Sequence, residues 1–171
     1  MALLLPTVAV NGVTDITPEL LRAMKASAII LDVDNTLAVH GSQVPLEGSI
    51  DWVKRMRGEN IKVIIVSNNL KRRVAPFAAK YGLSFLYLAF KPFPPAYFRA
   101  VHKMGARRRD AVVVGDQIFT DVIGANLSFM KSILLVPTAK ESSVSFRIRR
   151  AFEKPLRYLI KITGRGAKYF R

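Results

Sequence analysis

The 171-residue sequence contains no cysteine, which excludes disulfide bonds, structural zinc sites of the thiolate type and thiol catalysis. Acidic residues are scarce: 12 Asp and Glu stand against 27 Lys and Arg, giving a net charge of +15. Only two histidines occur, and neither His40 nor His102 is placed to serve a two-metal nuclease. The apolar stretch 1–10 is too short to cross a bilayer and lacks a basic start, so we expect a packed strand or a shallow membrane contact there.

Two aspartates, Asp32 and Asp34, follow a short apolar run, 28–31, that is typical of a buried strand. Carboxylates at the end of a buried strand lose hydration and repel each other, so another interaction must compensate for this cost in free energy. In most proteins a bound metal ion compensates for it, and the carboxylates are used in catalysis. Taken alone, the pattern also fits an ordinary turn in which Asn35 and Thr36 cap the following residues.

Three further strand-like runs end in polar residues. The run 61–66 ends at Ser67 and Asn68, the run 85–88 leads to Lys91, and the run 111–114 leads to Asp116 and Asp121. In a parallel α/β sheet, ligands gather beyond the carboxyl ends of the strands, near the point where the strand order reverses. Four strand ends would therefore bring carboxylates, a hydroxyl and an ammonium to one crevice, as phosphoryl transfer requires.

The alternation of strand and helix patterns predicts one doubly wound, Rossmann-like α/β domain over 1–137, with a five-stranded parallel sheet between helices. We expect helices near 46–57, 71–81, 95–104 and 118–127, and the fifth strand at 132–136. The residues between the motifs are too few to hold an inserted cap domain. A crevice without a lid favours a phosphate carried on a large molecule, or a homo-oligomer whose neighbouring subunit covers the site.

Residues 138–171 are predicted to form a basic, amphipathic helical extension with ten Lys or Arg and two Glu. On a helical wheel, Arg157 and Lys161 belong to a basic face, whereas Leu156 and Ile160 lie opposite. Such a segment is typical of a membrane interface, where anionic lipid attracts it. Packing of its apolar face on the sheet and nucleic-acid binding are the alternatives, although no nucleic-acid motif is visible.

Together, the four motifs resemble those of the haloacid dehalogenase (HAD) superfamily of phosphatases. The first motif is matched by 32–37, the second by Ser67, the third by Lys91 and the fourth by 115–121. The short spacing is similar to that of the capless members, subclass IIIA. Within these, Val-Ser-Asn-Asn, the Lys91-Pro92 pair and the apolar-to-basic tail resemble the YqeG type, whose related enzymes dephosphorylate phosphatidylglycerophosphate to phosphatidylglycerol.

This resemblance implies a Mg²⁺-dependent phosphomonoester hydrolase that passes through an aspartyl-phosphate. Asp32 would be the nucleophile, and Asp34 would act as general acid and then as general base. The implied phosphate-binding residues are Ser67, Asn68 and Lys91. The implied metal ligands are Asp32, the backbone carbonyl of Asp34, and Asp116, with Asp121 and Thr36 in the surrounding shell.

The resemblance also implies an anionic phospholipid substrate, phosphatidylglycerophosphate. The short apolar start without basic residues and the basic tail predict a cytoplasmic protein attached peripherally to the membrane. Lys71, Arg72 and Arg73 follow Ser67 by one helical turn, so they could line the rim of the crevice and meet lipid headgroups. Two alternatives stay open. One is a phosphatase of soluble sugar or nucleotide monophosphates, and the other is a basic adaptor for RNA or ribosomes with a vestigial site.

Overall fold

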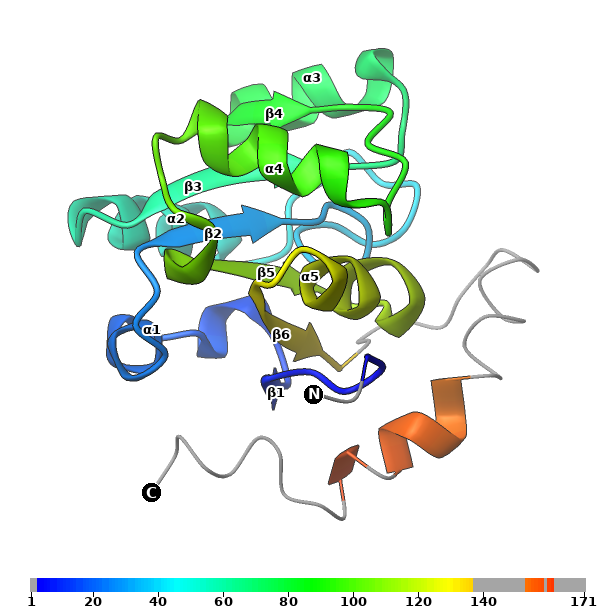
Figure 1. The fold of residues 1–171 in the computed structure, drawn as a ribbon. Coiled ribbons are helices and arrows are strands. Elements are labelled where there is room, and N and C mark those ends of the chain that lie inside the picture. Colours follow the sequence, from blue (N-terminus) through cyan, green and yellow to red (C-terminus); the bar gives the residue numbers. More distant parts are fainter. Residues whose placement is uncertain (1–2, 137–152, 159, 162–171) are drawn as a thin grey trace.

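The computed structural model describes residues 3–136, 153–158, 160 and 161. Its centre is a six-stranded parallel sheet with the order β1-β6-β5-β2-β3-β4 (Figure 1). The strands are β1 (Val8–Val10), β2 (Ala28–Leu31), β3 (Lys62–Val66), β4 (Ser84–Leu86), β5 (Ala111–Gly115) and β6 (Lys131–Leu135). The doubly wound α/β class is confirmed by this topology.

The predicted count of five strands was wrong, because the apolar N-terminal stretch supplies a sixth. Val8 and Val10 are buried and pair in parallel register with Ile133 and Leu135 of β6. A three-residue strand at the edge of a sheet leaves little periodic signal in the sequence. Of the two expectations for this stretch, the packed strand is the one that the structure contains.

Helices cover both faces of the sheet (Figure 1). One layer contains α1 (Pro18–Ala23), α2 (Ser49–Gly58) and α3 (Lys71–Tyr81), and the other contains α4 (Pro94–Lys103) and α5 (Ile123–Leu127). A π-helical turn, η3 (Ile118–Val122), leads into α5, and short 3-10 turns occupy Val13–Asp15 and Arg108–Asp110. Helix α1 was not predicted, although Thr17 caps it by accepting a hydrogen bond from the Leu20 amide.

Strand β2 is buried on both sides, which explains its uninterrupted apolar sequence. Ile29 and Leu31 pack with the layer of α1, α2 and α3, whereas Ala28 and Ile30 pack with the layer of α4 and α5. The chain runs from β2 outward to β3 and β4, and then returns to place β5 on the other side of β2. The order therefore reverses between β2 and β5, where α/β proteins bind their ligands.

The described part of the C-terminal extension lies against the domain. Residues 153–158 are helical, as are 160 and 161. Ile160 is buried and Leu156 packs beside it against Ile118 and Leu134. The other residues of the predicted extension, and its predicted start at 138, lie outside the described residues. Among those described, no helix has the length and apolar character needed to cross a bilayer.

Candidate active site

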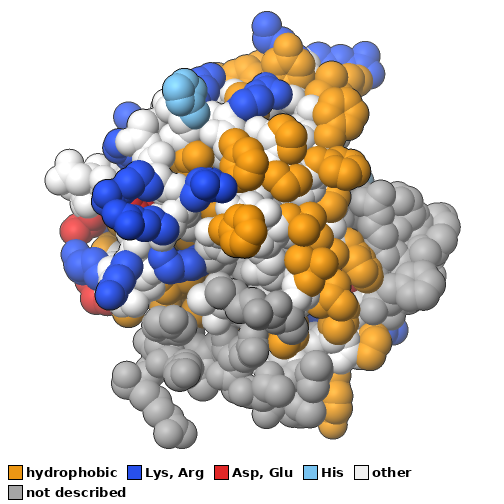
Figure 2. Space-filling view, viewed as in Figure 1, with side chains coloured by type: hydrophobic (Ala, Val, Ile, Leu, Met, Phe, Trp, Pro, Cys, Tyr) orange, Lys and Arg blue, Asp and Glu red, His pale blue; other side chains and the backbone are white. Residues whose placement is uncertain are grey.

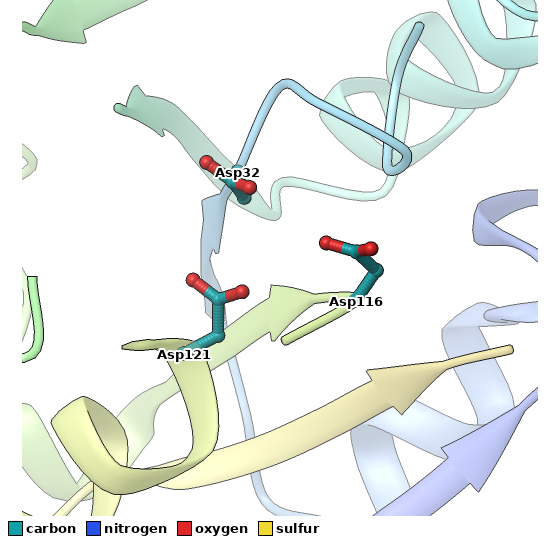
Figure 3. A group of neighbouring side chains, drawn as sticks. All are labelled: Asp32, Asp116 and Asp121. Atoms are coloured by element: carbon teal, nitrogen blue, oxygen red, sulfur yellow. The ribbon is translucent and has the colours of Figure 1, made fainter. Parts of the chain in front are cut away.

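Three buried carboxylates meet beyond the carboxyl ends of β2 and β5 (Figure 3). Asp32 follows β2, Asp116 follows β5, and Asp121 comes from the π-helical turn. One carboxylate oxygen from each lies within 4.8 Å of the corresponding oxygens of the other two. None of the three residues is more than 6% exposed. The register explains the meeting, because Leu31 pairs with Val114 and the Asp32 amide donates to the Val114 carbonyl.

Lys91 reaches the same cluster from the loop after β4. Its Nζ donates to Oδ1 of Asp32 at 2.6 Å and to Oδ1 of Asp121 at 2.7 Å. Asn68 fixes the Lys91 backbone from both sides, accepting from its amide at 2.7 Å and donating to its carbonyl at 3.2 Å. The side chain of Asn68, expected to bind phosphate, is thus engaged in positioning Lys91.

The electrostatics of this cluster are those of a cation site. Burial raises the pKa of Asp32 to about 7, although the Lys91 ammonium opposes the shift. Burial raises the pKa of Asp121 as well, again against Lys91. Burial alone would lower the pKa of Lys91, but Asp121 and Asp32 outweigh it and raise that pKa. Three ionised carboxylates and one ammonium carry a formal charge of −2, so the donor set fits a divalent ion that prefers oxygen ligands.

Asp34 lies beside this cluster in a separate network. Its Oδ2 accepts from Asn69 Nδ2 at 2.6 Å, and its Oδ1 accepts from the Arg73 guanidinium at 2.6 Å and the Gly41 amide at 3.1 Å. Arg73 also donates to the carbonyls of Gly41 and Ser42, at 2.9 and 3.3 Å. Arg73 is therefore committed to Asp34 and its loop, whereas the sequence placed it on the rim. Asn69 was missed, although it stands next to Asn68 in the motif.

The other predicted residues lie at or near the same end of the sheet. Ser67 is buried directly after β3, and its Oγ accepts from the Asn69 amide at 3.2 Å. Thr36 is buried in the turn after β2, and its Oγ1 has no hydrogen-bond partner among the described residues. Lys71 and Arg72 are exposed in the first turn of α3, where the sequence placed them.

Two residues of the C-terminal helix also reach the loop that carries Asp116. Oε1 of Glu153 accepts from the Ile118 amide at 2.7 Å. Arg157 donates to the carbonyls of Asp116 and Leu135 and to Oε2 of Glu153. The sequence placed Arg157 on a basic face toward solvent or lipid, but its side chain is only 18% exposed. The spacing of four residues between Glu153 and Arg157 predicts an ion pair on one helix. No feature of the neighbouring sequence predicts that both side chains also contact the loop that carries Asp116.

Comparisons with known proteins agree with this geometry. Residues 18–127 match the haloacid dehalogenase-like hydrolase family. The chain is 39% identical over 160 residues to the probable phosphatase YqeG of Bacillus subtilis (strain 168), covering 94% of this chain and 93% of that protein. It is 28% identical over 158 residues to phosphatidylglycerophosphate phosphatase 1, chloroplastic/mitochondrial, of Arabidopsis thaliana. That match covers 85% of this chain but only 45% of the Arabidopsis protein.

A solved structure shares the fold. The cobalt-bound form of the deoxy-D-mannose-octulosonate 8-phosphate phosphatase of Haemophilus influenzae has a TM-score of 0.55 and 16% identity, covering 77% of each chain. The family match includes the strands and loops that supply Asp32, Ser67, Lys91 and Asp116. The resemblance found in the four motifs is confirmed, and this chain belongs to the haloacid dehalogenase-like hydrolases.

Proposed function

We propose that this hydrolase is a Mg²⁺-dependent phosphomonoesterase with Asp32 as its nucleophile. The observation that carries the proposal is the position of Lys91, which lies between Asp32 and Asp121 beside the third carboxylate, Asp116. Asp32, Asp116 and the backbone carbonyl of Asp34 would hold the ion. When bound, Mg²⁺ would offset the charge of the carboxylates and of the substrate's phosphate oxygens.

The side chains supply the remaining chemistry. Lys91 holds Oδ1 of Asp32, so we assign the attack on phosphorus to Oδ2. That attack forms an Asp32–phosphorus ester bond and breaks the substrate's P–O bond, while Asp34 gives a proton to the leaving alkoxide. A water molecule then attacks phosphorus, Asp34 takes its proton, and breakage of the acyl-phosphate bond releases inorganic phosphate and Asp32. Ser67 and Lys91 would hold the non-bridging oxygens.

Arg73 and Asn69 suit the role assigned to Asp34. They donate to both of its carboxylate oxygens, which orients the ionised side chain for its role as general base. Holding a catalytic group in one geometry reduces the entropy lost on reaching the transition state. For Asp34 to transfer a proton, one of these donors would have to break its hydrogen bond to the carboxylate when the substrate enters.

We assign phosphatidylglycerophosphate as the substrate. The enzyme would act on it at the surface of an anionic membrane, to which the protein binds peripherally. Three observations support this assignment. The chain is similar to an Arabidopsis protein named for that activity. The connections at 32–48 and 67–70 hold no inserted domain over the crevice, which suits a phosphate on a large carrier. The net charge of +15 would attract the protein to anionic lipid.

The test is phosphate release from phosphatidylglycerophosphate in mixed micelles with Mg²⁺. We expect turnover by the unmodified chain and none by Asp32→Asn, which keeps the shape of the side chain but removes the nucleophile. Asp51→Asn is the matched control, because the Asp51 side chain is 83% exposed and pairs with Lys54 on α2. Faster turnover of soluble sugar or nucleotide monophosphates would contradict the lipid assignment. Inactivity on every phosphomonoester, together with salt-sensitive RNA binding, would instead support the adaptor.

A further inference from the structure

Just over half of the large apolar side chains that are exposed among the described residues lie at one end of the molecule. Seven of them, each between 39% and 71% exposed, lie in the loops that follow β2, β3 and β4: Val39, Val44, Leu70, Tyr87, Leu88, Phe90 and Phe93. We call this set the apolar rim. Figure 2 shows hydrophobic side chains gathered toward the end of the molecule to which the strands of Figure 1 point, while many Lys and Arg lie toward the opposite end.

Several residues of the apolar rim are close in sequence to the catalytic groups. Phe90 and Phe93 stand on either side of Lys91, whose ammonium binds Asp32. The Phe93 amide donates to the Phe90 carbonyl at 3.0 Å, so the two aromatic residues belong to one tight turn. Leu70 directly follows Asn69, which binds Asp34. Exposed aromatic and aliphatic groups therefore stand next in sequence to the residues that carry the chemistry.

Basic residues complete this face. Lys71 and Arg72 directly follow Leu70 and are exposed, and the first turn of α3 contains no acid. Within the three loops, at 32–48, 67–70 and 87–93, Glu47 is the sole exposed acid. Apolar side chains bordered by cations, with little negative charge, complement a bilayer surface of acyl chains beneath anionic headgroups.

We infer that the apolar rim, together with Lys71 and Arg72, is the face that docks on an anionic lipid bilayer. The crevice then opens directly onto the headgroups, and a phosphate attached to lipid reaches Asp32 without leaving the membrane. The bilayer takes the place of a lid by excluding bulk water from the mouth of the site. This inference rests on the proposed lipid substrate, but it makes a separate prediction about binding.

The test compares two double variants of the full chain. Phe90→Asn with Phe93→Ser removes the aromatic pair, and Asn is chosen because Phe90 has a positive φ of 53° that Asn tolerates. Phe98→Ser with Phe129→Asn is the matched control, because these exposed aromatic residues line a groove with 106–109, at the amino-terminal end of β5, and Phe129 likewise has a positive φ of 57°. Binding is measured by co-sedimentation with phosphatidylglycerol vesicles. Activity is measured on phosphatidylglycerophosphate and on soluble p-nitrophenyl phosphate.

We expect the rim variant to lose vesicle binding and lipid turnover by about tenfold or more, while its hydrolysis of p-nitrophenyl phosphate stays within about twofold. The control should match the unmodified chain in all three assays. Unchanged vesicle binding by the rim variant would overturn the inference, as would an equal loss in the control. A change from dimer to monomer without a change in vesicle binding would assign the face to a second copy and would also overturn it.

The inference and the proposed substrate can fail separately. Vesicle binding that depends on the apolar rim, in a protein that hydrolyses only soluble phosphomonoesters, would support the docking face and refute phosphatidylglycerophosphate as substrate. Turnover of phosphatidylglycerophosphate that is equal in the rim variant and the control would support the substrate and refute the docking face.

Discussion

Gly115 is the position at which a single methyl group should do most damage to the site. A Cβ added at this residue would lie 2.2 Å from Oδ2 of Asp121 and 2.3 Å from its Cγ. Ordinary contact begins at 3.4 Å, so the carboxylate would have to move by about 1.2 Å. The same carboxylate accepts from Lys91 at 2.7 Å and from the Gln117 amide at 3.2 Å. A shift of this size cannot preserve both bonds.

The loss of stability that we expect for Gly115→Ala has two contributions in free energy. Overpacking of a buried site costs about 1–3 kcal/mol, and weakening a hydrogen bond to a charged group costs about 1.5–3 kcal/mol. Because the strain is relieved partly by giving up the bond, we expect a loss of about 2–4 kcal/mol in the free energy of unfolding. In a domain of this size, that corresponds to a fall in Tm of about 5–15 °C. Displacing Lys91 from Asp32 by a comparable amount should lower kcat by about 100-fold.

The assay is thermal unfolding of the metal-free protein, followed by phosphomonoester turnover with Mg²⁺. Gly58→Ala is the matched control, because a Cβ at this last residue of α2 meets nothing within 4 Å. Alanine there should leave Tm unchanged or raise it, since glycine costs about 0.5–1 kcal/mol in a helix. If the Gly115→Ala protein has the same Tm as the Gly58→Ala control and a kcat within about twofold of the unmodified chain, the predicted steric clash is refuted.

Two further predictions concern the same cluster. Because burial raises the pKa of Asp32 to about 7 from its ordinary value of 3.8, its contribution to stability is full below about pH 4 and is lost as pH rises through about 7. The Tm of the metal-free protein should therefore fall between about pH 4 and 7, less steeply in Asp32→Asn, and an equal slope in that variant would contradict the assignment. Glu153→Ala should weaken Mg²⁺ binding by roughly tenfold in calorimetric titration, because Glu153 holds the Ile118 amide and Arg157 beside the Asp116 loop. Lys154→Ala, exposed on the same helix, is its control, and equal affinities would exclude a role for Glu153 in metal binding.

The sequence predicted the position of the site because its chemistry lies where strands end. Asp32 and Asp116 each follow a fully buried apolar strand, and parallel pairing brings such strand ends together whatever the details of the loops. Lys91 was found in the same way, one loop after β4. These residues depend on topology, which the alternation of apolar runs and helical patterns determines.

The contacts of Arg73 and Arg157 could not be predicted, because they depend on how loops fold in space. Arg73 belongs to a basic triplet, and only the path of the loop through Gly41 and Ser42 brings Asp34 within its reach. Arg157 lies on the basic side of a helical wheel, yet its guanidinium donates to the backbone carbonyls of Leu135 and Asp116. A helical wheel describes one helix alone and contains no information about unsatisfied acceptors elsewhere.

Glu153 and Arg157 follow the last strand in the sequence, and this sets an order of events during biosynthesis. Translation delivers all six strands and the three clustered aspartates before either of these residues leaves the ribosome. A nascent chain can thus assemble its sheet while the Asp116 segment still awaits its last two partners. The loop that carries Asp116 should consequently reach its final packing only after the sheet has formed.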